Sequence, residues 1–299
     1  MTADLRAARV GLATCAALPE GDPDDSALFD ALIAAHAQPE WLVWSNVSPD
    51  ACSGFDAVVL RSTWDYPDDR EAFLTWVDSV PSCVVNSPAL VRWNTDKSYL
   101  VELAVAGVPT VPTVVIESAE QHWSPPSGTE AFVVKPRVGA GSKGVRRFES
   151  MHDEGLARDY VASMVAAGRS VLIQPYLRSV DEGSETALIY LGGGFSHAVS
   201  KGPMLTEGDE RDVVEGLYLA EDIAARVPSG AQRDVAERTL AAVAGMVGDT
   251  AYARVDVVDD DDGNPVLLEL EVVEPSLYWG FRSGSAALMA STILGTIGG

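Results

Sequence analysis

The chain has 299 residues, 47% of them hydrophobic, which is enough for two or three domains with a sizeable core. Its formal net charge of -23 argues against nucleic acid as a partner, because phosphate backbones are bound by basic surfaces. The sequence has no apolar run of about 18 residues and no apolar start long enough for a signal peptide, so neither a membrane partner nor export is expected.

The three cysteines, Cys15, Cys52 and Cys83, lack C-x-x-C spacing, and because their number is odd they cannot all pair with one another. This pattern favours buried thiols in a reducing compartment over a disulfide or zinc framework. We therefore expect a cytoplasmic protein. The composition is also compatible with a homo-oligomer.

Strands and a helix alternate over the first ninety residues. The runs at 8–14, 41–44 and 56–61 are typical of buried strands, and residues 26–37 have the pattern of a helix. This alternation predicts a parallel α/β domain, which we assign to residues 1–92.

A glycine-rich segment follows a helix expected from Thr95 or Asp96 to Gly107 and strands expected at 110–116 and 131–136. The glycines of this segment, at 139, 141 and 144, match the G-x-G-x-x-G spacing of a dinucleotide-binding turn. Such a turn opens a helix, but GVRRFE (144–149) is typical of a strand. We therefore predict a hairpin between antiparallel strands, and a dehydrogenase would require residues 144–149 to be helical.

Lysine is scarce: only Lys97, Lys135, Lys143 and Lys201 are found among 21 basic residues. Two of the four flank the glycine segment, whose backbone N–H groups can fold over phosphates. A P-loop is excluded because G-x-x-x-x-G-K-[ST] is absent. The alternative is an ordinary tight turn.

The remaining elements alternate in the same way along the chain. A helix is expected at 153–167, a strand at 171–177, a hairpin at 185–203, a helix at 230–248 and strands at 252–258 and 266–273. We assign residues 93–175 to a central lid domain and residues 176–299 to a carboxy-terminal domain.

Four charged residues alternate on the last two strands. Arg254 and Asp256 share one face of their strand, as do Glu269 and Glu271 on the next. Pairing the strands would bring the three carboxylates together, which suits magnesium as a hard cation with oxygen ligands. The alternative is a solvated acidic face. The intervening loop DDDDG does not form an EF-hand, because Val258 occupies the first ligand position.

Taken in chain order, these motifs resemble the ATP-grasp superfamily of ligases from about residue 86 to 275. The resemblance implies an α/β (α+β) protein in which a parallel amino-terminal domain precedes a lid domain and a carboxy-terminal domain with antiparallel sheets. It implies ATP as a bound nucleotide, with Lys97 and Lys135 on its phosphates. The other implied nucleotide contacts are Gly139, Gly141, Ser142, Lys143 and Gly144 in the hairpin, Gln174, Pro175, Tyr176 and Leu177 at the adenine, and Asp181 or Glu185 at the ribose.

The segments R-x-D (254–256) and LLELE (267–271) are similar to the R-x-D…L-L-E-x-N pattern of D-alanine–D-alanine ligases, with Glu271 in place of the final Asn. The resemblance implies that Asp256, Glu269 and Glu271 hold Mg²⁺, with two ions expected. It implies that Arg254 stabilises an acyl phosphate and the tetrahedral intermediate that follows. Lys201 would reach the γ-phosphate or the substrate carboxylate, or else lie at the surface.

Two segments are candidates for the substrate pocket. In RSTWDY (61–66), Ser62, Thr63, Trp64 and Asp65 follow a predicted strand, where open sheets bind ligands. There Asp65 would suit an ammonium group, unless Trp64 belongs to the core and Asp65 caps the next helix. In EPSLYWGFRSGSA (274–286), Arg282 would hold a carboxylate, or start a helix at the surface, and Ser276 is a further candidate.

The full length, including RSTWDY, KPRVGAGSKGV and LLELEVVEPSLYWGFR, also resembles the cyclo-ligases of D-cycloserine biosynthesis. This resemblance implies a small amino-acid-like substrate, O-ureido-D-serine, which closes to D-cycloserine. The alternatives are an intermolecular dipeptide-type ligase, which needs an added nucleophile, and a non-catalytic nucleotide-binding regulatory module.

Overall fold

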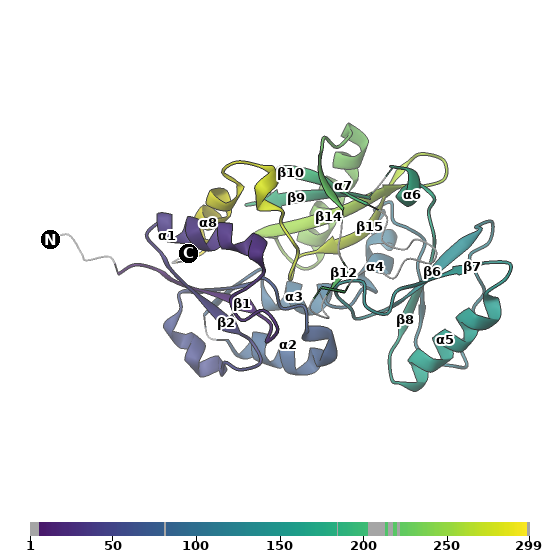
Figure 1. Ribbon diagram of the computed structural model, residues 1–299, viewed down its shortest axis with the longest axis horizontal. Helices are drawn as coiled ribbons and strands as arrows, with labels where there is room; N and C mark the ends of the chain where they lie inside the picture. The colour runs from purple at the N-terminus through teal and green to yellow at the C-terminus, as the bar shows by residue number, and fades with distance from the viewer. Residues whose placement is uncertain are drawn as a thin grey trace.

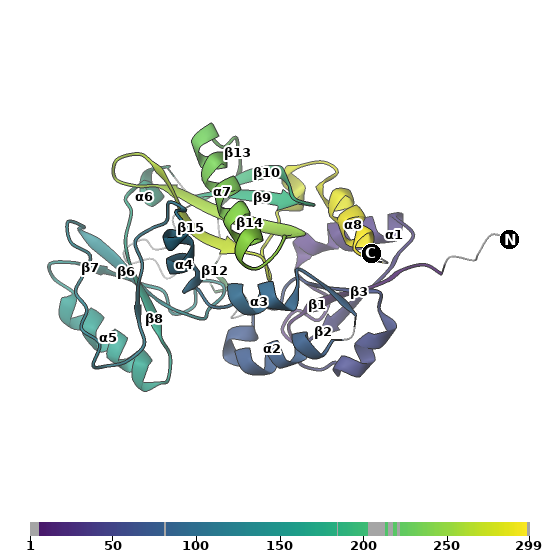
Figure 2. The ribbon, with the colours of Figure 1, turned by 180° about the vertical axis from the view of Figure 1, so that it is seen from behind.

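The computed structural model describes residues 6–80, 82–183, 185–202, 213–214, 218–219 and 222–297. Its strands form three sheets of four or five strands, besides a small pair made of β11 (Val213–Val214) and β12 (Tyr218–Leu219). In Figures 1 and 2 the amino-terminal sheet and the central sheet lie at opposite ends, and the third sheet joins them.

The amino-terminal sheet is parallel, with strand order β2-β1-β3-β4. Its strands are β1 (Arg9–Thr14), β2 (Gln38–Val43), β3 (Ala57–Leu60) and β4 (Cys83–Val85). Helix α1 (Ser26–Ala34) covers one face, and α2 (Arg70–Ser79) packs through Phe73 and Val77 against the other. The predicted parallel unit is confirmed, and Cys15 and Cys52 are buried free thiols.

The central sheet is antiparallel, with strand order β5-β8-β6-β7. Its strands are β5 (Val114–Ile116), β6 (Ala131–Pro136), β7 (Arg146–Glu149) and β8 (Val171–Pro175), and α5 (Glu154–Ala166) covers one face. Because β6 and β7 pair directly, the glycine segment between them is a hairpin. Residues 146–149 are a strand, so the dehydrogenase alternative is wrong.

The third sheet is antiparallel, with strand order β13-β10-β9-β14-β15. Its strands are β9 (Glu185–Leu191), β10 (Gly194–Lys201), β13 (Ile223–Arg226), β14 (Tyr252–Asp259) and β15 (Pro265–Glu271). The β9–β10 turn contains Gly192 and Gly193, both with positive φ, as the glycine run predicts. Pro203, at the end of the predicted hairpin, lies outside the described residues.

Helices cover both faces of this third sheet. On one face lie α3 (Pro88–Asn94), α4 (Tyr99–Val105) and α7 (Gly230–Met246); the other shares a core with α1, β1 and α8 (Ser285–Gly295). Figure 1 shows α8 beside α1. The helix predicted from Thr95 or Asp96 begins at Tyr99, since α3 already occupies the residues before it. A short helix, α6 (Ser179–Gly183), links β8 to β9. Among the described residues, every helix is too short or too polar to cross a bilayer.

Candidate active site

A cavity of about 440 Å³ opens between the central sheet and the third sheet, and segments of the amino-terminal sheet close one end. Many of the predicted site residues line it: Trp64, Lys97, Lys135, Gly139, Gly141, Ser142, Lys143, Gln174, Pro175, Tyr176, Leu177, Glu185, Lys201, Arg254, Glu269, Glu271 and Ser276. These residues come from segments up to 212 positions apart (276 − 64) and are brought together only by the fold.

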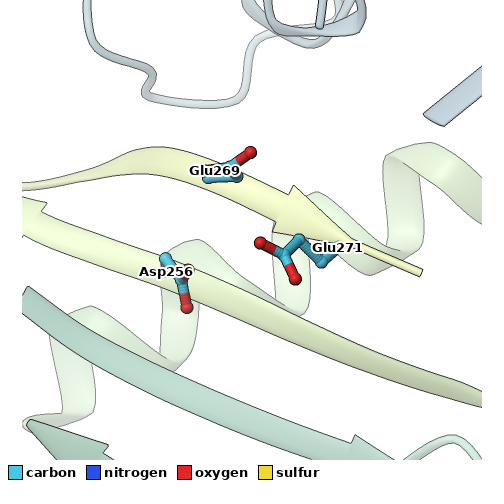
Figure 3. A group of neighbouring side chains, drawn as sticks. All are labelled: Asp256, Glu269 and Glu271. Carbon is cyan, nitrogen blue, oxygen red and sulfur yellow. The ribbon is translucent and has the colours of Figure 1, made fainter. Parts of the chain in front are cut away.

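Three carboxylates converge on the strand pair β14–β15. Asp256 is paired with Glu269 across the ladder, and Arg254 with Glu271. One oxygen from each of Asp256, Glu269 and Glu271 lies within 4.8 Å of the other two, and Figure 3 shows the carboxylate of Glu271 turned towards Asp256. The predicted grouping of the three acids is therefore observed. Converging oxygens from two strands fit a hard cation such as Mg²⁺.

A bulge in β15 shapes this part of the cavity. The register shifts between the pairs Asp256–Glu269 and Val257–Leu267, so Leu268 is an extra residue. Leu267 and Leu270 can therefore both be buried although they are three residues apart. Leu268 and Glu269 both line the cavity as a result.

Each acid of the triad already has a basic partner. Arg254 donates to Asp256 at 3.0 Å and to Glu271 at 2.6 Å, and Lys97 forms an ion pair with Glu269. Lys201 is 4% exposed and bridges two carboxylates, lying 2.8 Å from Glu185 and 3.4 Å from Asp256. The surface alternative for Lys201 is therefore wrong.

The ion pairs set the charge states of the carboxylates. Burial raises the pKa of Glu269, but the charges of Lys97 and Lys135 outweigh it and lower that pKa to about 2. Burial also opposes ionisation of Asp256, whose pKa nevertheless lies below its usual value because Arg254 and Lys201 are adjacent. Burial raises the pKa of Glu185 to about 8, although Lys201 partly offsets it. Glu269 and Asp256 are thus anionic at neutral pH and available as metal ligands.

Lys135 reaches the cavity from β6, and its charge acts on Glu269 of the acid triad. It is 7% exposed, and it makes no ion pair or side-chain hydrogen bond within the described part of the chain. Burial, reinforced by the charge of Lys97, lowers its pKa. A buried ammonium group without a paired carboxylate is costly, so this side chain is suited to an anionic ligand.

The glycine hairpin follows Lys135 directly. Gly141, Ser142 and Gly144 have φ values of 62°, 61° and 72°, the left-handed region that favours glycine. The Gly144 carbonyl accepts a hydrogen bond from the Tyr160 hydroxyl at 2.7 Å, which ties the hairpin to α5. Gly144 itself does not line the cavity, whereas Gly139, Gly141, Ser142 and Lys143 do.

The predicted hinge lines the cavity at the end of β8. The Gln174 amide donates to Thr113 at 2.8 Å, and the Arg147 guanidinium stacks over the Tyr176 ring at 4.0 Å. The Tyr176 hydroxyl donates to Asp181 at 2.6 Å. Of the two candidates for the ribose, Glu185 lines the cavity and Asp181 does not.

The segment RSTWDY is placed differently from the prediction. Ser62 is fully buried and shares a hydrogen bond with Thr14, and Thr63 is fully buried too. Asp65 accepts a hydrogen bond from Trp44 at 2.6 Å and makes no side-chain capping bond. Only Trp64 of the four predicted residues lines the cavity. Ser62 and Thr63 are buried behind the end of the sheet, and the half-buried Asp65 is bound by Trp44 instead of lining the cavity.

Instead, this segment holds two other loops in place. The Trp64 indole donates to the Glu274 carbonyl at 3.0 Å, and Arg61 donates to the Pro275 carbonyl at 2.8 Å. Ser62 accepts a bond from the Asp22 amide at 3.2 Å. The loops around Asp22 and Glu274 are thereby brought to one end of the cavity.

Several further residues that line the cavity could not be predicted from the sequence: Asp22, Asp24, Tyr66, Asn94, Glu274, Tyr278 and Phe281. Arg282, by contrast, lies outside the cavity and donates to the Ser196 carbonyl at 2.6 Å. The only local signal was the acidic loop at 22–25. Its position depends on Arg61, whose partner Asp25 lies 3.0 Å away.

The family model for the amino-terminal domain of D-cycloserine synthetase DcsG matches residues 10–86. The cycloserine biosynthesis protein DcsG of Streptomyces lavendulae is 35% identical over 285 residues, which cover 91% of this chain and 93% of that relative. The chain belongs to the DcsG family. A crystal structure of D-cycloserine synthetase DcsG matches this member of the DcsG family with a TM-score of 0.84 and 32% identity, over 97% of this chain and 99% of that one.

A more distant match extends the comparison beyond the DcsG family. The D-alanine–D-alanine ligase of Bacillus anthracis complexed with ATP has a TM-score of 0.65 and 15% identity, over 97% of this chain and 96% of that one. At this identity the match concerns the fold alone. The predicted ATP-grasp fold is confirmed by these matches.

Proposed function

We propose that this protein is an ATP- and magnesium-dependent ligase that joins a carboxylate to a nitrogen atom. The observation that carries the proposal is that the buried Lys135, which has no ion pair among the described residues, lines the same cavity as Glu269 and Glu271, whose carboxylates group with that of Asp256. A cation and a group of carboxylates in one cavity suit a phosphate chain that carries a metal ion.

The nucleotide would lie between the central sheet and the third sheet. Lys97 and Lys135 would offset the charge of its phosphates, and the backbone of the glycine hairpin would fold over them. The segment from Gln174 to Leu177 would contact the adenine. Glu185 is the proposed ribose contact, because it lines the cavity and Asp181 does not.

Asp256, Glu269 and Glu271 would hold magnesium, with two ions as the proposed number. The metal supplies charge neutralisation at the transferring phosphoryl group. Lys97 forms an ion pair with Glu269 in this structure. When ATP occupies the cavity, its phosphates would compete with Glu269 for Lys97, and Glu269 would then be free to bind the metal ion.

For the substrate we propose O-ureido-D-serine, on the support of 35% identity to the S. lavendulae cycloserine biosynthesis protein. Its carboxylate would attack the γ-phosphorus of ATP to give an acyl phosphate and ADP. The nitrogen bonded to the side-chain oxygen would then attack the acyl carbon and expel inorganic phosphate. Hydrolysis of the ureido group releases carbon dioxide and ammonia, and the five-membered ring is D-cycloserine.

Arg254 would stabilise the oxygen that becomes negative when the nitrogen attacks; its support is that it lines the cavity beside Glu271. Lys201 would hold the positions of Glu185 and Asp256, and it would be close enough to contact the transferred phosphate or the substrate carboxylate. Ring closure within one molecule needs no second pocket for a nucleophile.

The test is ADP release from ATP and Mg²⁺ with O-ureido-D-serine as sole acceptor, followed by mass spectrometry of the product. ADP together with D-cycloserine is expected. Lys135→Ala and Glu269→Ala should each abolish ADP release, whereas Arg158→Ala, on an exposed part of α5, should retain it. Full activity in either of the first two variants would refute the proposal.

Two other outcomes would identify the alternatives. ADP release only after a second amino acid or amine is added would indicate an intermolecular ligase. Tight ATP binding without turnover on a broad panel of amino acids would indicate a regulatory module.

A further inference from the structure

The charges around the cavity divide into two groups. Near the nucleotide side, five basic residues (Lys97, Lys135, Lys143, Lys201 and Arg254) line the cavity with three carboxylates (Glu185, Glu269 and Glu271), and Asp256 is buried beside them. Basic side chains therefore offset the carboxylates in this part of the cavity.

The end closed by the amino-terminal segments is different. Asp22, Asp24 and Glu274 line it, and the described residues supply no ion-pair partner to any of the three. Arg61 is engaged by Asp25 through two nitrogens at 3.1 Å and 3.0 Å, and Lys97, whose charge acts on Glu274, is ion-paired with Glu269. Acidic side chains therefore outnumber basic ones at this end of the cavity.

Glu274 is the most buried of these three residues, and it lines the cavity although it is only 7% exposed. Its carboxylate accepts a hydrogen bond from the Tyr66 side chain, but the ion pairs of the described residues do not include it. Its backbone is fixed by Trp64 at 3.0 Å, and the next carbonyl by Arg61 at 2.8 Å. The backbone at Glu274 is thus fixed at the cavity wall, and in the described part of the chain its carboxylate has no ion-pair partner.

The pKa values of two of these carboxyl groups lie above their ordinary values. Burial and the charge of Glu271 raise the pKa of Glu274 to about 8. Burial and the neighbouring carboxylates of Asp25 and Asp24 raise the pKa of Asp22 to about 6. A carboxylate whose ionised form is disfavoured in the empty cavity gains most from a cationic ligand.

We propose that Glu274 binds the ammonium group of an amino-acid substrate, and that Asp22 and Asp24 strengthen the negative potential around it. The inference rests on the proposed function, which makes the substrate amino-acid-like. It transfers to Glu274 the role that the sequence suggested for Asp65, whose carboxylate is bound by Trp44 outside the cavity. The enzyme would thereby select α-amino acids over acids of the same shape that lack the amino group.

The test compares O-ureido-D-serine with 3-(ureidooxy)propanoate, which differs only by the missing amino group. Binding is measured by calorimetry in the presence of Mg²⁺ and a non-hydrolysable ATP analogue. Wild-type protein should prefer the ammonium compound by about 100-fold, as expected for a charged hydrogen bond in a buried site. Glu274→Gln should reduce the preference to below about 10-fold while leaving the affinity for the nucleotide analogue unchanged.

Two further variants distinguish direct binding by Glu274 from the effect of neighbouring carboxylates. Asp22→Asn should reduce the preference less than Glu274→Gln does, and Asp65→Asn should leave it unchanged. If Glu274→Gln weakens both compounds equally, its role is structural and the inference is overturned. A larger loss of preference in Asp22→Asn or Asp65→Asn would also overturn the assignment to Glu274.

ADP release by the wild type with O-ureido-D-serine, measured in parallel, distinguishes this inference from the proposed function. A preference for the ammonium compound without ADP release would refute the proposed reaction and retain the inference. ADP release by the wild type, together with an unchanged preference in Glu274→Gln, would retain the proposed reaction and refute the inference. If the wild type neither binds the two compounds nor releases ADP, both are overturned.

Discussion

Lys97 and Glu269 are 172 residues apart in the sequence and form a partly buried ion pair in the cavity. Lys97 precedes α4, and Glu269 lies on β15, so the pair links the segment before the central sheet to the third sheet. Both residues were predicted at the site, but as partners of ATP and of magnesium respectively. The pair between them holds the two in position before a ligand arrives.

Removing one member of this pair should cost more stability than removing both. We expect Lys97→Met and Glu269→Met each to lower the free energy of unfolding by about 3 kcal/mol, because each leaves a charge with little access to solvent and without its partner. The double variant should recover most of this loss and remain inactive. Urea unfolding of the wild type, the two single variants and the double variant measures this double-mutant cycle. The prediction would be contradicted if the double variant lost as much free energy of unfolding as the two single variants together.

Glu274→Gln should stabilise the protein at mildly alkaline pH. The pKa of Glu274 in the folded protein is about 8, above its ordinary value of 4.5, so folding favours the protonated form. Its contribution to stability is complete below pH 4.5 and is lost as the pH rises through 8. The amide does not titrate, so the variant should be more stable than wild type by about 3 kcal/mol at pH 9 and nearly equal at pH 4.5.

Urea unfolding at several pH values between 4.5 and 9 provides the measurement for Glu274→Gln. Glu71→Gln is the matched control, because the Glu71 side chain is 81% exposed. Parallel pH profiles for wild type and Glu274→Gln would show that Glu274 is not the group responsible.

Arg61→Lys should weaken substrate binding without altering nucleotide binding. Arg61 is 1% exposed, and its guanidinium group donates hydrogen bonds to both Asp25 and the Pro275 carbonyl. The single ammonium group of lysine cannot reproduce both bonds. We expect a loss of about 2 kcal/mol in the free energy of unfolding and an increased KM for the amino acid, with the KM for ATP unchanged. Arg9→Lys, at a partly exposed pair, serves as control. A raised KM for ATP in Arg61→Lys would contradict this role.

Gly144→Ala should loosen the glycine hairpin, and Gly139→Ala should not. Gly144 has a φ of 72°, and an added Cβ would lie 3.0 Å from Pro136 Cγ. At Gly139 φ is not in the left-handed region, and the nearest atom would be 3.6 Å away. We expect a cost of about 1 kcal/mol for Gly144→Ala, visible as faster amide exchange in β6 and β7. Equal exchange in the two variants would contradict the prediction.

Local pattern was sufficient for much of the fold. The strand at 131–136 was predicted at its observed bounds, because the apolar run AFVV is followed by Lys135, Pro136 and a glycine segment. The triad followed from the two-residue period of strands. Helix α3 was missed, since its seven residues beginning at Pro88 are too few to show a helical period.

The substrate end of the cavity could not be predicted in the same way. Glu274 is placed by Trp64, 210 residues earlier, and Pro275 by Arg61, 214 residues earlier. Neither contact leaves a trace in the spacing of nearby residues. Asp65, which has the right chemistry in the sequence, is turned away by a bond to Trp44 that depends on how α2 and β2 pack.

The packing of α8 against α1 also determines the order in which the chain can complete its cores. Leu28 and Leu32 of α1 share a core with Met289 and Ile293 of α8, more than 250 residues later (289 − 32 = 257). During synthesis the central sheet, whose core uses residues from 116 to 173, has all of its parts early. The amino-terminal sheet is synthesised first, but one of its faces is not covered until the last helix, α8, has been made. Until then the apolar side chains on that face are exposed to solvent and can aggregate.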